Sequence, residues 1–137
     1  DYLHYASISA DKLYRIPYAN IIDANLSNDE LSATVEVVAE KTMTDGMAMD
    51  PQGNVYLSDL EHSAIVRMLP SGELQTLLKS ASIRWPDGFS FGPQGHLYFT
   101  CSSLHQVIGN SAQVIKKNGP YQIYRFMPPA VITEDTE

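Results

Sequence analysis

The chain has 137 residues, of which 44% are hydrophobic and 18% charged, a balance that predicts a folded globular protein and not a disordered one. The formal net charge of −7 argues against a nucleic-acid partner or an anionic membrane surface, because both are bound through a basic face. One cysteine, Cys101, is too few for an intrachain disulfide framework or a cysteine zinc site, and no apolar run approaches the roughly 20 residues that span a bilayer.

The first 40 residues predict the outer part of one sheet with a short helix. Strands are expected at 2–8 and 12–17, which are rich in Tyr, Leu and Ile and are bounded by turn residues. The stretch SNDE fits a capping box, in which the Ser27 hydroxyl accepts from the Glu30 backbone N–H and the Glu30 side chain reaches back. It predicts a helix near 27–33. The β-branched stretch TVEVVAEK then predicts a further strand.

One stretch of the chain is repeated. TDGMAMDPQGNVYLSD, at 44–59, aligns without a gap with PDGFSFGPQGHLYFTC, at 86–101. Asp45 falls on Asp87, so the offset is 87 − 45 = 42 residues. Self-similarity at a period of about 40 to 50 residues, combined with strand-like sequence, is typical of the blades of a β-propeller.

Both copies continue as a series of short strands. In the first copy, strands are expected at 46–50, 55–58, 64–69 and 74–78. In the second copy, they are expected at 89–91, 97–101 and, after a polar insert at 102–120, at 121–127. An apolar-x-Arg-apolar element marks a third strand at Arg15, Arg67 and Arg125. Four short antiparallel strands make one propeller blade, so the fold class expected is all-β, with four-stranded antiparallel sheets.

The predicted organisation is one partial propeller domain over 1–137. It consists of a partial blade at 1–40, blades at 41–80 and 83–128, and a tail at 129–137. A closed propeller has at least four blades, so this chain is not expected to close a ring alone. We expect a fragment, since the chain starts in strand-like sequence without Met, and its expected partners are the remaining N-terminal blades or a second copy of the chain.

A set of motifs in fixed order resembles the major royal jelly protein and yellow protein family, in particular its bacterial members. The motifs are DGM followed by GNVY, then WPD, then LYF with a later LH pair, and last YQIYRF. The resemblance runs from about residue 12 to residue 127. It implies a six-bladed β-propeller of which this chain is the C-terminal portion, and a secreted or periplasmic location. It also implies a small organic ligand in or near the central channel, with a dopachrome-tautomerase-like or otherwise uncharacterised activity.

The PDG stretch and the following G-x-L-Y turn also resemble the gluconolactonase and regucalcin-type lactonases, which are six-bladed propellers with a divalent metal on the axis. This resemblance implies an alternative function as a metal-dependent, Ca²⁺-type lactonase or hydrolase. Asp87 stands in the PDG that supplies a ligand there, whereas Asp45 stands where those enzymes commonly carry Asn. The Glu that an early blade supplies is not part of this chain. A structural or interaction propeller without a small ligand is the third alternative.

Asp45 and Asp87 are the leading candidates for a site, and two interpretations of them stay open. An Asp before Gly often accepts backbone N–H groups in the turn that leads into a strand. Alternatively, both carboxylates stand at the channel mouth on neighbouring inner strands and contact a ligand, or Ca²⁺ or another divalent cation, which prefers oxygen ligands. In that case we expect the two side chains within about 10 Å of each other.

Trp85 and His105 complete the candidate ligand-binding residues. Trp85 is expected either to pack between blades or to line the channel, where it would stack on an aromatic or cationic ligand. His105 belongs to the LH pair of the royal jelly pattern and is otherwise an ordinary loop residue. Cys101 lies in a predicted strand and is expected to be a buried, inert thiol. The chain has no G-x-S-x-G elbow and no phosphate-binding glycine pattern, so no catalytic residue is assigned.

Overall fold

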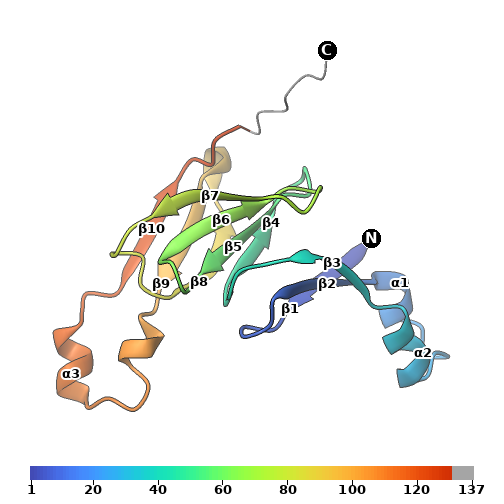
Figure 1. The fold of residues 1–137 in the computed structure, drawn as a ribbon, viewed down its shortest axis with the longest axis horizontal. Helices are drawn as coiled ribbons and strands as arrows, with labels where there is room; N and C mark the ends of the chain where they lie inside the picture. The colour runs from blue at the N-terminus through green and yellow to red at the C-terminus, as the bar shows by residue number, and fades with distance from the viewer. Residues whose placement is uncertain (131–137) are drawn as a thin grey trace.

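The computed structural model describes residues 1–130, which form three antiparallel sheets that follow one another along the chain (Figure 1). Within each sheet the strands are hydrogen-bonded in chain order, as in the meander of a propeller blade. The all-β prediction is therefore confirmed. The predicted tail lies outside the described residues apart from 129 and 130. No helix in the described part is long and apolar enough to cross a membrane.

The first sheet has three strands and carries two short helices on one connection. Its strands are β1 (Tyr2–Ala6), β2 (Lys12–Pro17) and β3 (Glu36–Glu40). Helices α1 (Tyr18–Ile21) and α2 (Asn28–Ala33) connect β2 to β3. The capping box of α2 forms as predicted, because Ser27 Oγ accepts from the Glu30 backbone N–H and the Glu30 carboxylate accepts from the Ser27 backbone N–H. Helix α1 was not predicted, since it is a single turn that follows Pro17.

The second sheet is the complete four-stranded blade that the first copy of the repeat predicts. Its strands are β4 (Met47–Met49), β5 (Val55–Asp59), β6 (Ala64–Met68) and β7 (Leu74–Lys79). Every residue of β5 and β6 is buried. These strands are covered on both faces because the sheet lies between the other two (Figure 1).

The third sheet, β8 (Pro86–Phe91), β9 (Leu97–Cys101) and β10 (Gln122–Phe126), has three strands among the described residues. The connections contain the short helical turns η1 (Pro93–Gly95) and η2 (Leu104–Gln106). The polar insert before β10 is not all loop as expected, because it forms helix α3 (Ala112–Lys117). Ser111 starts this helix, since its hydroxyl accepts from the Val114 backbone N–H.

The repeated arginines show how the three sheets correspond. Each arginine lies directly across a strand pair from an aromatic side chain, in the pairs His4–Arg15, Tyr56–Arg67 and Tyr98–Arg125. Strand β1 therefore corresponds to β5 and β9, the second strands of their blades. Strands β5 and β9 are each paired with an inner strand, β4 and β8, whereas β1 has no such partner among residues 1–130.

Two apolar clusters join the sheets. The cluster between the first and second sheets contains Leu13, Val55, Leu57, Val66 and Met68. The cluster between the second and third sheets contains Ile65, Ile83, Phe99 and Cys101. Cys101 is buried as predicted, and burial raises the pKa of its thiol, which keeps it protonated and unreactive. The middle sheet thus supplies side chains to both clusters.

The inner strands of the second and third sheets meet at Gly46. A Cβ atom built on Gly46 would lie 1.4 Å from the Asp87 carbonyl oxygen and 2.6 Å from the Phe89 ring. The backbone of the first copy therefore lies directly against the backbone of the second. Only glycine allows this approach.

Gly46→Ala should lower the free energy of unfolding by at least about 2 kcal/mol, because a backbone oxygen cannot move aside as a side chain can. The matched control is Gly88→Ala at the equivalent position of the second copy. A Cβ on Gly88 would meet only the Thr100 hydroxyl, at 3.2 Å. Urea denaturation of both variants measures the difference, and equal losses would contradict the close approach at Gly46.

Candidate functional site

Asp45 and Asp87 lie where the inner strands of the two copies begin, and both copies hold them in the same way. Ser58 Oγ accepts from the backbone N–H groups of Asp45 and Gly46, at 2.9 and 3.2 Å. In the second copy, Thr100 Oγ1 accepts from the Gly88 N–H at 3.0 Å. In each copy, a hydroxyl from the second strand thus accepts from backbone N–H groups that an Asp side chain in a turn would otherwise accept from. The two carboxylates are therefore available for other partners.

The indole of Trp85 links the two blades. Trp85 Nε1 donates to Asp45 Oδ2 at 2.7 Å. The Trp85 backbone has a φ of 53°, in the left-handed region that non-glycine residues seldom adopt. Its carbonyl accepts from the Ser102 backbone N–H at 3.1 Å, as the Met43 carbonyl accepts from Leu60 in the first copy. The Trp85 side chain therefore bonds to the preceding blade, while its backbone bonds to Ser102 of its own sheet's connection.

His105 lies against the Trp85 indole. It is an exposed residue of η2, and its ring is stacked on the Trp85 indole with 5.9 Å between centroids and 24° between planes. The turn that carries it starts at Ser103, whose backbone is also left-handed, with a φ of 48°. Asp45, Trp85 and His105 thus form a continuous series of contacts from the first copy to the second.

Asp87 lies close enough to Asp45 for the two charges to interact. Partial burial, and then the negative charge of Asp45, raise the pKa of the Asp87 carboxyl above its ordinary value. Two carboxylates that affect each other in this way lie in one local field. The structure therefore brings together all four residues that the sequence singles out, at one end of the inner strands.

These residues do not by themselves fit a cation site. Within residues 1–130, no group of three His, Cys, Asp or Glu side chains is placed to hold a metal ion. One oxygen of Asp45 is already bonded to Trp85, and partial burial, with the negative charge of Asp45, raises the pKa of the Asp87 carboxyl. The two carboxylates supply at most part of a divalent site, which needs several oxygen ligands.

Two residues beside the site were not predicted from the sequence. The hydroxyl of Ser103 is fully buried and has no hydrogen-bond partner among the described residues. Arg84 donates to the Gln106 side chain and to the Asn118 carbonyl, both at 3.1 Å, and so ties η2 to the end of α3. The repeat carries no signal for either residue, because the first copy has Glu61 and Thr42 at the equivalent positions, 42 residues earlier.

The comparisons with known proteins identify the fold. No protein-family profile matches the chain, and no curated protein matches it. Among solved structures, the chain is similar to a virginiamycin B lyase from Staphylococcus aureus, with 14% identity, a TM-score of 0.53 and coverage of 94% of this chain. A streptogramin B lyase structure is similar at 14% identity, a TM-score of 0.52 and the same coverage.

The chain spans 38% of the length of each of these structures. Identities this low show the fold alone, which is that of a β-propeller, with this chain forming part of one. The two structures are not royal jelly or yellow proteins, so that resemblance stays a prediction from the motifs.

The raised pKa of Asp87 predicts how the free energy of unfolding depends on pH. Protonation of a carboxyl with a raised folded-state pKa favours the folded state, fully so below the ordinary value of 3.8. That contribution is lost as the pH rises through the folded-state pKa. Asp87→Asn should therefore stabilise the protein near neutral pH by up to about 0.5 kcal/mol.

The gain should disappear in acid, below the ordinary pKa of the carboxyl. Thermal unfolding of both proteins across this pH range is the measurement. A difference in Tm that stays constant with pH would show that the substitution acts through packing and not through charge.

Proposed function

We propose that this end of the propeller binds a small organic cation with an aromatic or other flat group. The observation that carries the proposal is the contact series from Asp45 through Trp85 to His105, with the Asp87 carboxyl beside it. An indole that is hydrogen-bonded to Asp45 and stacked on a histidine offers a surface for stacking and for cation–π attraction. Two adjacent carboxylates favour a positive group at the same place.

The proposal agrees with the small organic ligand that the royal jelly resemblance implies. It also explains why the two carboxylates are not neutralised by basic side chains, since the ion pairs among the described residues are Lys12–Glu40, Arg15–Glu36 and His62–Asp59. A bound cation would favour the ionised form of Asp87 and so offset the burial that raises its pKa.

A second candidate function is proton transfer at the same site. General acid–base catalysis works best when the pKa of the catalytic group moves toward the working pH, and the pKa of Asp87 moves in that direction. Such chemistry agrees with the tautomerase-type activity implied by the royal jelly resemblance, and lyases are the similar structures. The lactonase alternative has less support, because the described residues do not form a complete cation site.

Binding is tested with 2-phenylethylamine as the probe and 2-phenylethanol as its neutral counterpart, by isothermal titration calorimetry. The amine should bind and the alcohol should bind more weakly, because only the amine is attracted by the carboxylates. Trp85→Ala should weaken binding of the amine about tenfold, which corresponds to about 1.4 kcal/mol.

His105→Ala should also weaken binding of the amine. The matched control is His96→Ala, which removes a histidine from the turn at the opposite end of β9 and should change nothing. Equal binding of amine and alcohol would contradict a cation site, and no binding of either would favour the interaction propeller. Turnover of a bound compound that Asp87→Asn abolishes without loss of binding would establish the second candidate.

We also propose that further blades complete the ring beside β1. Strand β1 corresponds to β5 and β9, yet its inner edge is unpaired among the described residues. Its side chains Tyr2, Leu3 and Tyr5 are 44%, 52% and 39% exposed. An unpaired strand edge beside exposed apolar side chains invites pairing with another strand. That strand would come from additional blades of a longer chain or, as the alternative, from a second copy.

The 137-residue chain alone should therefore associate or aggregate in solution. Size-exclusion chromatography with light scattering, followed by thermal unfolding, makes the measurement. Coexpression with a polypeptide that supplies the missing blades should restore a discrete species. A monomer of 15.2 kDa that unfolds cooperatively would contradict the proposal.

A further inference from the structure

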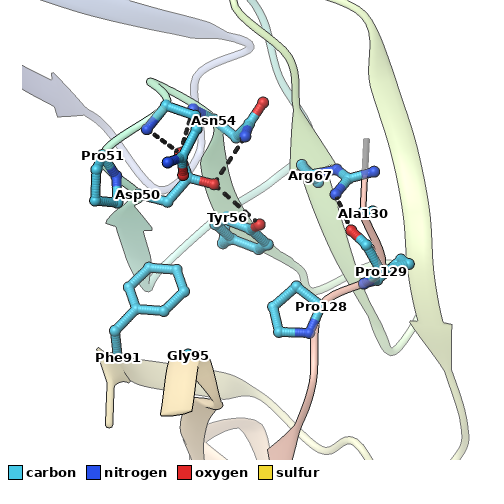
Figure 2. Close-up of a pocket in the computed structure, with 11 residues that line it drawn as sticks. Asp50, Pro51, Asn54, Tyr56, Arg67, Phe91, Gly95, Pro128, Pro129 and Ala130 are labelled. Atoms are coloured by element: carbon cyan, nitrogen blue, oxygen red, sulfur yellow. Dashed lines mark hydrogen bonds between the residues drawn. The ribbon is translucent and has the colours of Figure 1, made fainter. Parts of the chain in front are cut away.

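A pocket of about 530 Å³ lies between the second and third sheets, at the opposite end of β4 from Asp45 (Figure 2). Its volume falls in the range of small-molecule sites. Figure 2 shows Tyr56, Phe91 and Pro128 around this space, with Asp50 and Arg67 on the two sides of Tyr56. The rings of Tyr56 and Phe91 meet edge to face at 5.3 Å. The pocket is therefore an aromatic space that lies next to charged groups.

Arg67 is the unusual member of this lining. It is only 3% exposed, although a guanidinium is rarely buried unless it is paired with an anion. Its Nη1 donates to the Pro129 carbonyl at 2.6 Å, and its Nη2 donates to Gln75 Oε1 at 2.8 Å. Its Nε is buried without a hydrogen-bond partner among the described residues. The guanidinium is thus held by neutral acceptors, and its buried Nε has no acceptor among the described residues.

The equivalent arginine of the first sheet has the partner that Arg67 lacks. Arg15 lies across the strand pair from Glu36 and forms an ion pair with it at 2.7 Å. Arg67 lies across the strand pair from Gln75 in the same way. The position that holds a carboxylate beside Arg15 therefore holds a neutral amide beside Arg67.

The nearby carboxylate of Asp50 does not fill this role. It accepts from the backbone N–H groups of Gln52 and Asn54, from the Asn54 side-chain amide and from the Tyr56 hydroxyl. These bonds occupy both of its oxygens, and it has no ion pair with Arg67 in the described part of the chain. The Tyr56 ring stands between Asp50 and Arg67 (Figure 2).

We propose that this pocket binds a small organic carboxylate with a flat or apolar body. The body would lie against Tyr56, Phe91 and Pro128, and the carboxylate would bind the guanidinium of Arg67. Because Nε is buried and Nη1 carries the Pro129 carbonyl, the carboxylate replaces that carbonyl as Pro129 moves aside and Pro128 stays against the ligand body. A charge-assisted hydrogen bond to a carboxylate is stronger than the bond to the neutral carbonyl that it replaces.

The experiment titrates the protein with benzoate and with benzamide, its neutral counterpart, by isothermal titration calorimetry. Benzoate should bind, and benzamide should bind at least tenfold more weakly. Arg67→Met should remove the preference for benzoate. The matched control is Arg125→Met, because Arg125 faces Tyr98 as Arg67 faces Tyr56 but is exposed. That control should leave benzoate binding unchanged.

A second variant keeps the test independent of whether Arg67→Met folds. Gln75→Glu supplies the carboxylate that the first sheet has at this position, so it should pair with Arg67 and abolish benzoate binding. Equal affinities for benzoate and benzamide, or benzoate binding that survives Gln75→Glu, would overturn the proposal. A chain that ends at Ala130 should bind benzoate as the full chain does. Binding by the shortened chain alone would mean that residues after Ala130 supply the anion, and would also overturn it.

Discussion

The contact between Gly46 and the Asp87 carbonyl is the constraint on which the rest of the structure depends. A side chain at Gly46 would occupy the same space as the backbone of the next blade, so the two inner strands meet only because this residue has no Cβ. The contact places Asp45 beside Asp87 and brings Trp85 within hydrogen-bonding distance of Asp45. One close approach between backbones thus brings the candidate residues of the two blades together.

The two copies share their framework and differ where they carry chemistry. Hydroxyls at Ser58 and Thr100 bind the start of each inner strand, and equivalent carbonyls accept equivalent backbone N–H groups. The residue that supplies the carbonyl is Met43 in the first copy and Trp85 in the second. Because the shared bonds hold the backbone, the side chain at this position is free to differ. An indole there reaches the preceding blade.

The strands could be predicted from the sequence because their signals are local. The offset of 42 residues and the turns around Gly53 and Gly95 predict β4, β5, β8 and β9, and the other strands were predicted from their own composition. Two strands differ clearly in extent. Strand β1 ends at Ala6 and not at residue 8, and β8 begins at Pro86 and not at residue 89, since an irregularity between Pro86 and Phe89 lets Pro86 pair with Cys101. Helices α1 and α3 were missed because four and six residues are too few to show a helical period.

The candidate residues of the site could be chosen from the sequence, but the contacts between them could not. The sequence identifies Asp45, Trp85, Asp87 and His105 through the repeat and the family resemblance, whereas the Trp85–His105 stack depends on the turn at Ser103. The pocket at Arg67 could not be predicted from the sequence of one blade, because residues of two sheets line it. Its burial arises only where two sheets pack together and where Pro129 crosses from the end of the third sheet to the second.

The two ends of the inner strands have opposite charge preferences, and their separation lets them coexist. Asp45 and Asp87 favour a cation at one end, and Arg67 favours an anion at the other. The five residue steps from Asp45 to Asp50 extend roughly 17 Å at the rise of a β-strand. This is about twice the Debye length of roughly 8 Å at physiological ionic strength. The charges at one end are therefore largely screened from those at the other, and a chain with a formal net charge of −7 can still offer a site for an anion.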